Sequence, residues 1–153
     1  MIRLLRIIFL SLFPMVAYAQ IDQPKEIQTF QKFGPYTVHY TVFNSKQIPP
    51  QVADIYKLTR SKDVVFINIS LTKTENGTTS LGLPAEVRAK AVNLMQQSKL
   101  IEFREIKEPD ATYYLASFRH TNEEDIRFDV SVLPNGEAQP LTVSFSRRLY
   151  IEN

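Results

Sequence analysis

Apolar and polar residues alternate along most of this chain with a period of two, which is typical of β-strands with one buried face. In the segment 36–43 one face carries Tyr36, Val38, Tyr40 and Val42, and the other carries Thr37, His39, Thr41 and Phe43. The segment 125–133 alternates even more regularly, with inward-facing apolar residues Ile126, Phe128, Val130 and Val132. Both segments are predicted strands, and the Tyr36 row is the predicted core face of the first.

Four further strands are expected over Val64–Leu71, Leu100–Ile106, Thr112–Arg119 and Leu141–Ile151. The last of these keeps an apolar row that is broken only by Arg147. Asn-Gly pairs at 76–77 and 135–136 supply the positive φ values of tight turns. The polar stretch 20–32 is expected to form an N-terminal arm or an edge strand.

In two segments the apolar residues have helical spacing in place of, or in addition to, strict alternation. Pro49-Pro50 opens a stretch in which Val52, Ile55 and Tyr56 have helical spacing, and this predicts a short helix. The stretch 84–98 fits helical spacing and alternation alike, and its residue propensities favour a helix. About seven to eight strands with at most one short helix predict an all-β, antiparallel β-sandwich.

The first nineteen residues have the composition of a secretory signal peptide. Arg3 and Arg6 precede the apolar run 7–16, and Ala17-Tyr18-Ala19 offers small residues for cleavage after Ala19. An uncleaved membrane anchor is the alternative, but the apolar run is far shorter than the ~20 residues that span a bilayer. The remaining chain is of a size suited to one domain, expected over residues 33–153.

The charge balance and the lack of cysteine exclude several kinds of partner and site. Removal of the leader lowers the 18 basic residues to 16, equal to the 16 acidic residues, so the mature chain has no basic excess for nucleic acid or membrane. We therefore expect a periplasmic protein with no nucleic-acid partner and no membrane insertion after cleavage. The chain has no cysteine, which excludes disulfides, thiol nucleophiles and cysteine metal sites.

The sequence offers no recognisable catalytic constellation. It has two histidines, His39 and His120, with no metal-ligand spacing around them, and no serine in a sharp turn between small residues. No glycine-rich phosphate loop is present. We expect a protein that is not an enzyme and that has no cofactor and no metal site. The aromatic pair Tyr113-Tyr114 suggests a carbohydrate or peptide surface, although alternating aromatic residues are more often core.

Several spaced blocks are similar to those of a bacterial family. They are Y-x-V-H-Y-x-x-F-N-S at 36–45, Y-K-L-T-R-S-K at 56–62, N-I-S at 68–70, E-F-R-E-I at 102–106 and the pair Tyr113-Tyr114. With these blocks the chain resembles domain-of-unknown-function family 4426. The resemblance implies a periplasmic domain of a Gram-negative bacterium with an immunoglobulin-like sandwich, and it implies no activity. It also implies that 84–94 is a strand, which we prefer to the helix.

Two functional hypotheses follow. The first is a non-catalytic module that interacts with another envelope protein or a peptide, for example by strand addition at a sheet edge. The second is a small-ligand binder or hydrolase with a polar cluster around His39. The candidate interaction residues are His39, Asn44, Ser45, Arg60, Ser61 and Asn68. A structural interpretation, in which Asn44-Ser45 and Arg60-Ser61 cap turns, is favoured for those two pairs. The oligomeric state is not indicated by the sequence.

Overall fold

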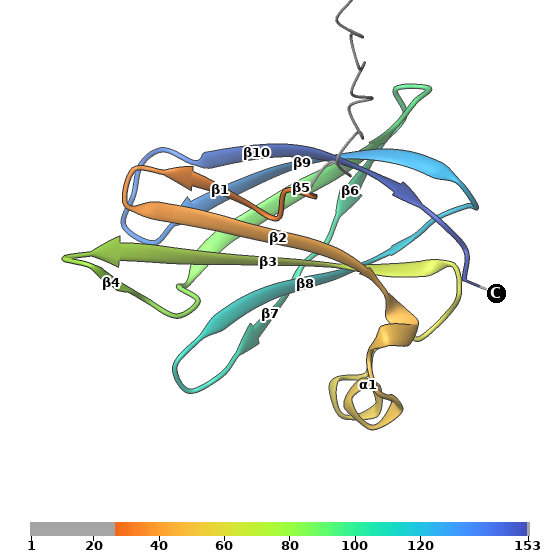
Figure 1. The fold of residues 1–153 in the computed structure, drawn as a ribbon, viewed down its shortest axis with the longest axis horizontal. Helices are drawn as coiled ribbons and strands as arrows, with labels where there is room; N and C mark the ends of the chain where they lie inside the picture. The colour runs from red at the N-terminus through yellow and green to blue at the C-terminus, as the bar shows by residue number, and fades with distance from the viewer. Residues whose placement is uncertain (1–26, 153) are drawn as a thin grey trace, which may run out of the picture.

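The computed structural model describes residues 27–152, which fold into two antiparallel β-sheets packed face to face (Figure 1). The predicted signal peptide and most of the predicted N-terminal arm lie outside the described residues. The strands are β1 (Phe30–Phe33), β2 (Tyr36–Asn44), β3 (Val64–Glu75), β4 (Thr78–Thr79), β5 (Ala85–Asn93), β6 (Ser98–Ile101), β7 (Arg104–Lys107), β8 (Thr112–Arg119), β9 (Glu124–Pro134) and β10 (Leu141–Leu149). The predicted all-β sandwich is confirmed. Residues 27–152 contain ten strands where about seven to eight were expected, and β1, β4, β6 and β7 are only two to four residues long.

The larger sheet has the order β1-β2-β3-β8-β7, and β4 pairs with the end of β3. The smaller sheet has the order β10-β9-β5-β6. The residues of β1 belong partly to the predicted arm, and they form an edge strand that turns into β2 at Gly34. Between β2 and β3 the chain forms the 3-10 turn η1 (Ser45–Gln47) and the helix α1 (Pro50–Tyr56), so the short helix is confirmed.

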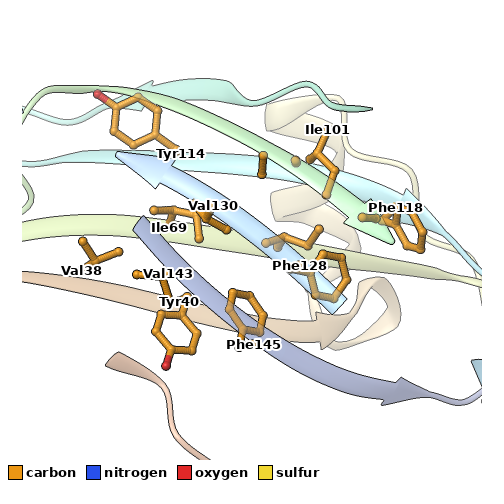
Figure 2. Close-up of a cluster of buried hydrophobic side chains, with 14 of the residues drawn as sticks. Val38, Tyr40, Ile69, Ile101, Tyr114, Phe118, Phe128, Val130, Val143 and Phe145 are labelled. Atoms are coloured by element: carbon orange, nitrogen blue, oxygen red, sulfur yellow. The ribbon is translucent and has the colours of Figure 1, made fainter. Parts of the chain in front are cut away.

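The core lies between the sheets and is built from the alternating rows. Val38 and Tyr40 of β2 are buried, as are Ile126 and Phe128 of β9, so both predicted core faces are confirmed. Figure 2 shows Tyr40 beside Phe145 of the other sheet, and their rings stack with centroids 4.3 Å apart. Such aromatic contacts bury large areas in a preferred geometry and join the two layers.

The stretch that was hardest to interpret from sequence is β5, a strand. It pairs with β9 along its whole length, from Ala85 opposite Pro134 to Asn93 opposite Ile126. The choice of strand over helix is therefore confirmed. Pairing on both sides and burial of Ala89, Ala91 and Val92 outweigh the helix propensity of the isolated segment.

The prediction of one continuous strand over Leu100–Ile106 is wrong. The segment is divided into β6, in the smaller sheet, and β7, in the larger one. The chain crosses between the layers at Glu102 and Phe103, and Phe103 packs against the core there. Burial does not alternate through the crossing, because Ile101 and Phe103 are at least partly buried whereas Arg104 and Glu105 are both exposed.

Candidate functional site

The two serines of the candidate set hold the base of the loop that carries α1. The Ser45 side chain is fully buried, and its hydroxyl donates to the Ser61 carbonyl oxygen at 2.8 Å. The same Oγ accepts from the Ser61 backbone N–H, also at 2.8 Å. One hydroxyl thus satisfies both backbone groups of the residue that closes the loop 45–61. We call this pair of bonds the Ser45–Ser61 clasp.

Asn44 and Arg60 reinforce the clasp from either side. The Asn44 side-chain oxygen accepts from the Lys46 N–H at 2.8 Å and caps the turn η1, while its amide donates to the Lys62 carbonyl at 3.4 Å. Arg60 Nη2 donates to the Lys46 carbonyl at 3.1 Å. Four of the six predicted site residues therefore come together as turn caps, in agreement with the structural interpretation.

His39 lies elsewhere, on the outer face of the larger sheet. Its Nε2 is 3.0 Å from the Thr72 hydroxyl, and its ring lies 6.3 Å from that of Phe30. Burial lowers the pKa of His39, which favours the neutral imidazole. Asn68 lies on the same sheet, opposite Thr41 of β2 and Leu115 of β8. The polar cluster around His39 that the second hypothesis requires does not assemble among the described residues.

The structure reveals a different feature, a groove between α1 and the outer face of the larger sheet. It has a volume of about 310 Å³, and we call it the α1 groove. Its lining is mainly apolar and aromatic and consists of Phe43, Ile48, Pro49, Val52, Tyr56, Leu58, Asn68, Ile106, Glu108, Tyr113 and Leu115. Pockets of this size and character are typical of binding sites. Asn68 is the one candidate residue from the sequence that contributes to this lining.

The residues at the two ends of α1 determine where the helix begins and ends and hold it against the sheet. Pro50 occupies the first turn of the helix, where its missing N–H costs nothing. The helix ends after about two turns because Lys57 adopts the left-handed conformation, with φ of 53°. Arg104 of β7 donates to the Tyr56 carbonyl and ties the helix end to the edge of the sheet. The clasp at one end and Arg104 at the other fix the groove.

The residues that form the α1 groove were given another role by sequence reasoning. The helical spacing of Val52, Ile55 and Tyr56 predicted the helix but gave no function to its apolar stripe, in which Ile55 is 72% exposed and Tyr56 is 39% exposed. The pair Tyr113-Tyr114 divides between two environments, with Tyr114 buried in the core and Tyr113 lining the groove. The proximity of this aromatic pair to the helix is tertiary information, which the sequence pattern does not contain.

Residues 27–152 contain no group of three or more His, Cys, Asp or Glu side chains arranged to hold a metal ion. No helix in the same range has the length and apolar character needed to cross a bilayer.

Comparisons with known proteins give one family and one shared fold. The model of the family DUF4426, described as a domain of unknown function, matches residues 30–152. A DUF4426 family protein from Pseudomonas aeruginosa has 34% sequence identity to this chain, and its crystal structure superposes with a TM-score of 0.68. That match covers 81% of this chain and 95% of the other. No curated protein sequence matches the chain.

More distant structures share the fold alone. FetP from a uropathogenic Escherichia coli strain has 11% identity and a TM-score of 0.54, over 81% of this chain and 94% of FetP. A copper-bound variant of FetP has 11% identity and a TM-score of 0.53, over 78% of this chain and 92% of the variant. At this identity the likeness concerns the two-sheet architecture.

Proposed function

Since this chain belongs to the DUF4426 family, whose function is unknown, its role has to be argued from its surface, and we propose that it is a non-catalytic interaction module of the bacterial envelope. The α1 groove is the observation that carries the proposal. The partner is a polypeptide segment with apolar side chains, which occupies the groove and contacts the exposed rim of α1.

The apolar rim supports a partner that is itself partly apolar. Ile55 is 72% exposed and stands beside Val52 and Tyr56, both 39% exposed, on a helix of seven residues. Burial of such side chains against a partner contributes roughly 25 cal/mol for each Å² removed from water. Aromatic residues such as Tyr56 and Tyr113 are also enriched where partners bind most strongly. Val52 and Tyr56 belong to the groove lining, and the exposed Ile55 lies beside them on the same helix.

Charge and edge geometry define the partner further. Glu108 is the one charged side chain among the described lining residues, so a segment with a Lys or Arg beside its apolar residues complements the groove. Ile106, in the lining, belongs to β7, which pairs with β8 on one side and ends the order of the larger sheet. A bound segment that runs along β7 therefore has backbone partners as well as side-chain contacts.

The proposal assigns no reaction to the protein. His39 contacts a threonine hydroxyl, and His120 Nδ1 lies 2.8 Å from the Thr121 carbonyl. A hydroxyl nucleophile needs a base that is itself oriented by a third group. Among residues 27–152 no side chain forms a hydrogen bond with Nδ1 of His39. The envelope location is proposed from the leader composition of residues 1–19.

Site-specific photo-crosslinking in cells tests the proposal. A photoreactive amino acid at Ile55 is expected to capture a discrete envelope protein from the full-length chain. The matched control position is Leu94, which is 78% exposed in the turn after β5. The adduct at Ile55 should disappear when Val52→Glu places a charge in the groove. Identical adducts at both positions, or an adduct that survives Val52→Glu in a folded protein, would contradict the proposal.

A further inference from the structure

Arg147 occupies a position in β10 where the alternating pattern calls for an apolar side chain. Its neighbours in the inward row, Val143, Phe145 and Leu149, are buried. The strand β10 ends the order of the smaller sheet and lies near β2 of the larger one. Arg147 is therefore a cation at the edge of the sandwich, in the row that elsewhere forms the core.

The guanidinium is held in place by backbone carbonyls and by an aromatic ring. Nη2 donates to the Gln28 carbonyl at 2.7 Å, and Nη1 donates to the Ser146 carbonyl at 2.8 Å. The guanidinium carbon lies 5.0 Å from the centroid of the Phe145 ring, which stacks on Tyr40. Two of the five N–H donors of the side chain are used in these bonds, which leaves three for another acceptor.

No carboxylate within residues 27–152 forms an ion pair with Arg147, whereas its neighbour Arg148 pairs with Glu123 at 2.9 Å. Burial lowers the pKa of Arg147, which indicates that its charge is partly removed from water. A partly buried charge without a counter-ion is costly, and proteins generally pair such charges. The position is thus suited to an external anion.

Arg147 lines a cleft of about 340 Å³. The cleft lies where β1 has ended: β1 pairs with β2 only as far as His39, so the edge of β2 from Thr41 onward faces the cleft. The walls carry apolar groups, including Val42 and Leu149, and the hydroxyl-bearing residues Thr29 and Thr41. Arg147 and Arg148 both line the cleft, but Arg148 is already paired with Glu123, so Arg147 is the lining cation that has no carboxylate partner among residues 27–152. A site with such a cation, several apolar walls and a few hydroxyls fits a small molecule with an apolar body and one anionic group.

We propose that the cleft between β2 and β10 binds a small organic carboxylate, with the carboxylate on the Arg147 guanidinium and the apolar body against Val42 and Leu149. A carboxylate matches the planar fork of a guanidinium. Glu152 also lines the cleft, and it disfavours ligands with two negative charges, such as a phosphate monoester. This cleft shares only Phe43 with the lining of the α1 groove, and neither proposal depends on the other.

The ligand can derive from a lipid or from a peptide C-terminus, and the experiment separates the two. The mature chain is titrated with octanoate and with N-acetyl-leucyl-leucine while the amide NMR signals of Thr41 and Leu149 are followed. Saturable shifts with either ligand support the proposal, and the tighter one assigns the source. Octanol, which lacks the charge, should bind at least about tenfold more weakly.

Variants distinguish binding from a purely structural role of Arg147. Arg147→Gln should weaken carboxylate binding by about tenfold or more, and Arg147→Lys should retain part of it because the charge remains. Arg88→Gln, on the exposed outer face of the smaller sheet, is the matched control and should bind like the unmodified chain. Each variant is first checked for an unchanged NMR fingerprint outside the cleft. Equal binding of octanol and octanoate, absence of saturable shifts, or full affinity in folded Arg147→Gln would overturn the proposal.

Discussion

Ser45 and Ser61 are joined by two hydrogen bonds of 2.8 Å through one buried hydroxyl, although they lie sixteen positions apart in the chain. The segment between them contains all of α1. These two candidate residues therefore fasten a loop, and that loop forms one wall of the α1 groove.

Ser45→Ala is expected to lower the free energy of unfolding by about 1–3 kcal/mol, because it removes both bonds of the buried hydroxyl and leaves the Ser61 N–H without its partner, while the Ser61 carbonyl keeps only its bond from the Val64 N–H at 3.3 Å. The substitution should also speed amide exchange at Leu58, whose N–H donates to the Ala53 carbonyl at the end of α1. Urea unfolding and hydrogen exchange measure the two effects. The control is Ser98→Ala at an exposed position of β6. Equal free energies of unfolding for the two variants would show that the Ser45–Ser61 clasp does not stabilise the fold.

Tyr114→Phe tests a bond between the two sheets. The Tyr114 hydroxyl of β8 accepts from the Ala85 N–H at the start of β5, at 2.7 Å. Loss of the hydroxyl leaves that N–H unpaired at a half-buried position, with an expected cost of about 1–3 kcal/mol. Tyr150→Phe, at a residue that is 56% exposed, should change the free energy of unfolding by less than ~0.5 kcal/mol. Thermal or chemical denaturation of both variants provides the comparison.

His39 should make stability depend on pH on the acidic side of neutrality. Burial holds the pKa of His39 below its ordinary value of 6.5, so the unfolded chain binds a proton at a higher pH than the folded chain. Stability is then unaffected above pH 6.5 and falls as pH decreases through 6.5 toward the folded pKa. His39→Gln should flatten this part of the profile. Parallel profiles of the two proteins between pH 7 and pH 5 would refute the expectation.

The signal peptide expected over residues 1–19 implies a defined mature N-terminus. Amino-terminal sequencing of the protein from a periplasmic extract is expected to begin at Gln20. Ala19→Leu should leave the precursor uncut, because signal peptidase requires a small residue there. Recovery of a chain that begins at Met1 from the cytosolic fraction of the unmodified strain would be incompatible with this expectation.

The strands were predictable because alternation reports directly which face of a strand is buried. Val38 and Tyr40, or Ile126 and Phe128, face the core as their spacing indicates. The hairpin turns were predictable for a local reason as well, since Asn76 and Gly77 adopt positive φ values of 50° and 79°. Alternation carries no information on which sheet a strand joins. For that reason the crossing at Glu102 and Phe103 was missed, and one strand was predicted where two exist.

The candidate site was harder to predict than the fold. His39, Asn44 and Ser45 are close in sequence, but β2 extends the chain by about 3.3 Å per residue, and alternation points neighbouring side chains to opposite faces. The extended strand therefore places these three residues apart in space although they are close in sequence. The α1 groove combines residues from α1, β3, β7 and β8, and no local pattern links these segments. The sequence shows Arg147 as a break in an apolar row. Its surroundings could not be predicted, because they depend on where β2 lies relative to β10.

The division of one sequence segment between two sheets has a consequence for how the protein unfolds. Because β6 and β7 are separated by only Glu102 and Phe103, the edge of one sheet cannot detach without displacing the edge of the other. The pairings of β3 with β8 and of β5 with β9 join residues distant in sequence, which slows folding but leaves few stable partial structures. We expect a single cooperative transition in which fluorescence and circular dichroism report the same midpoint.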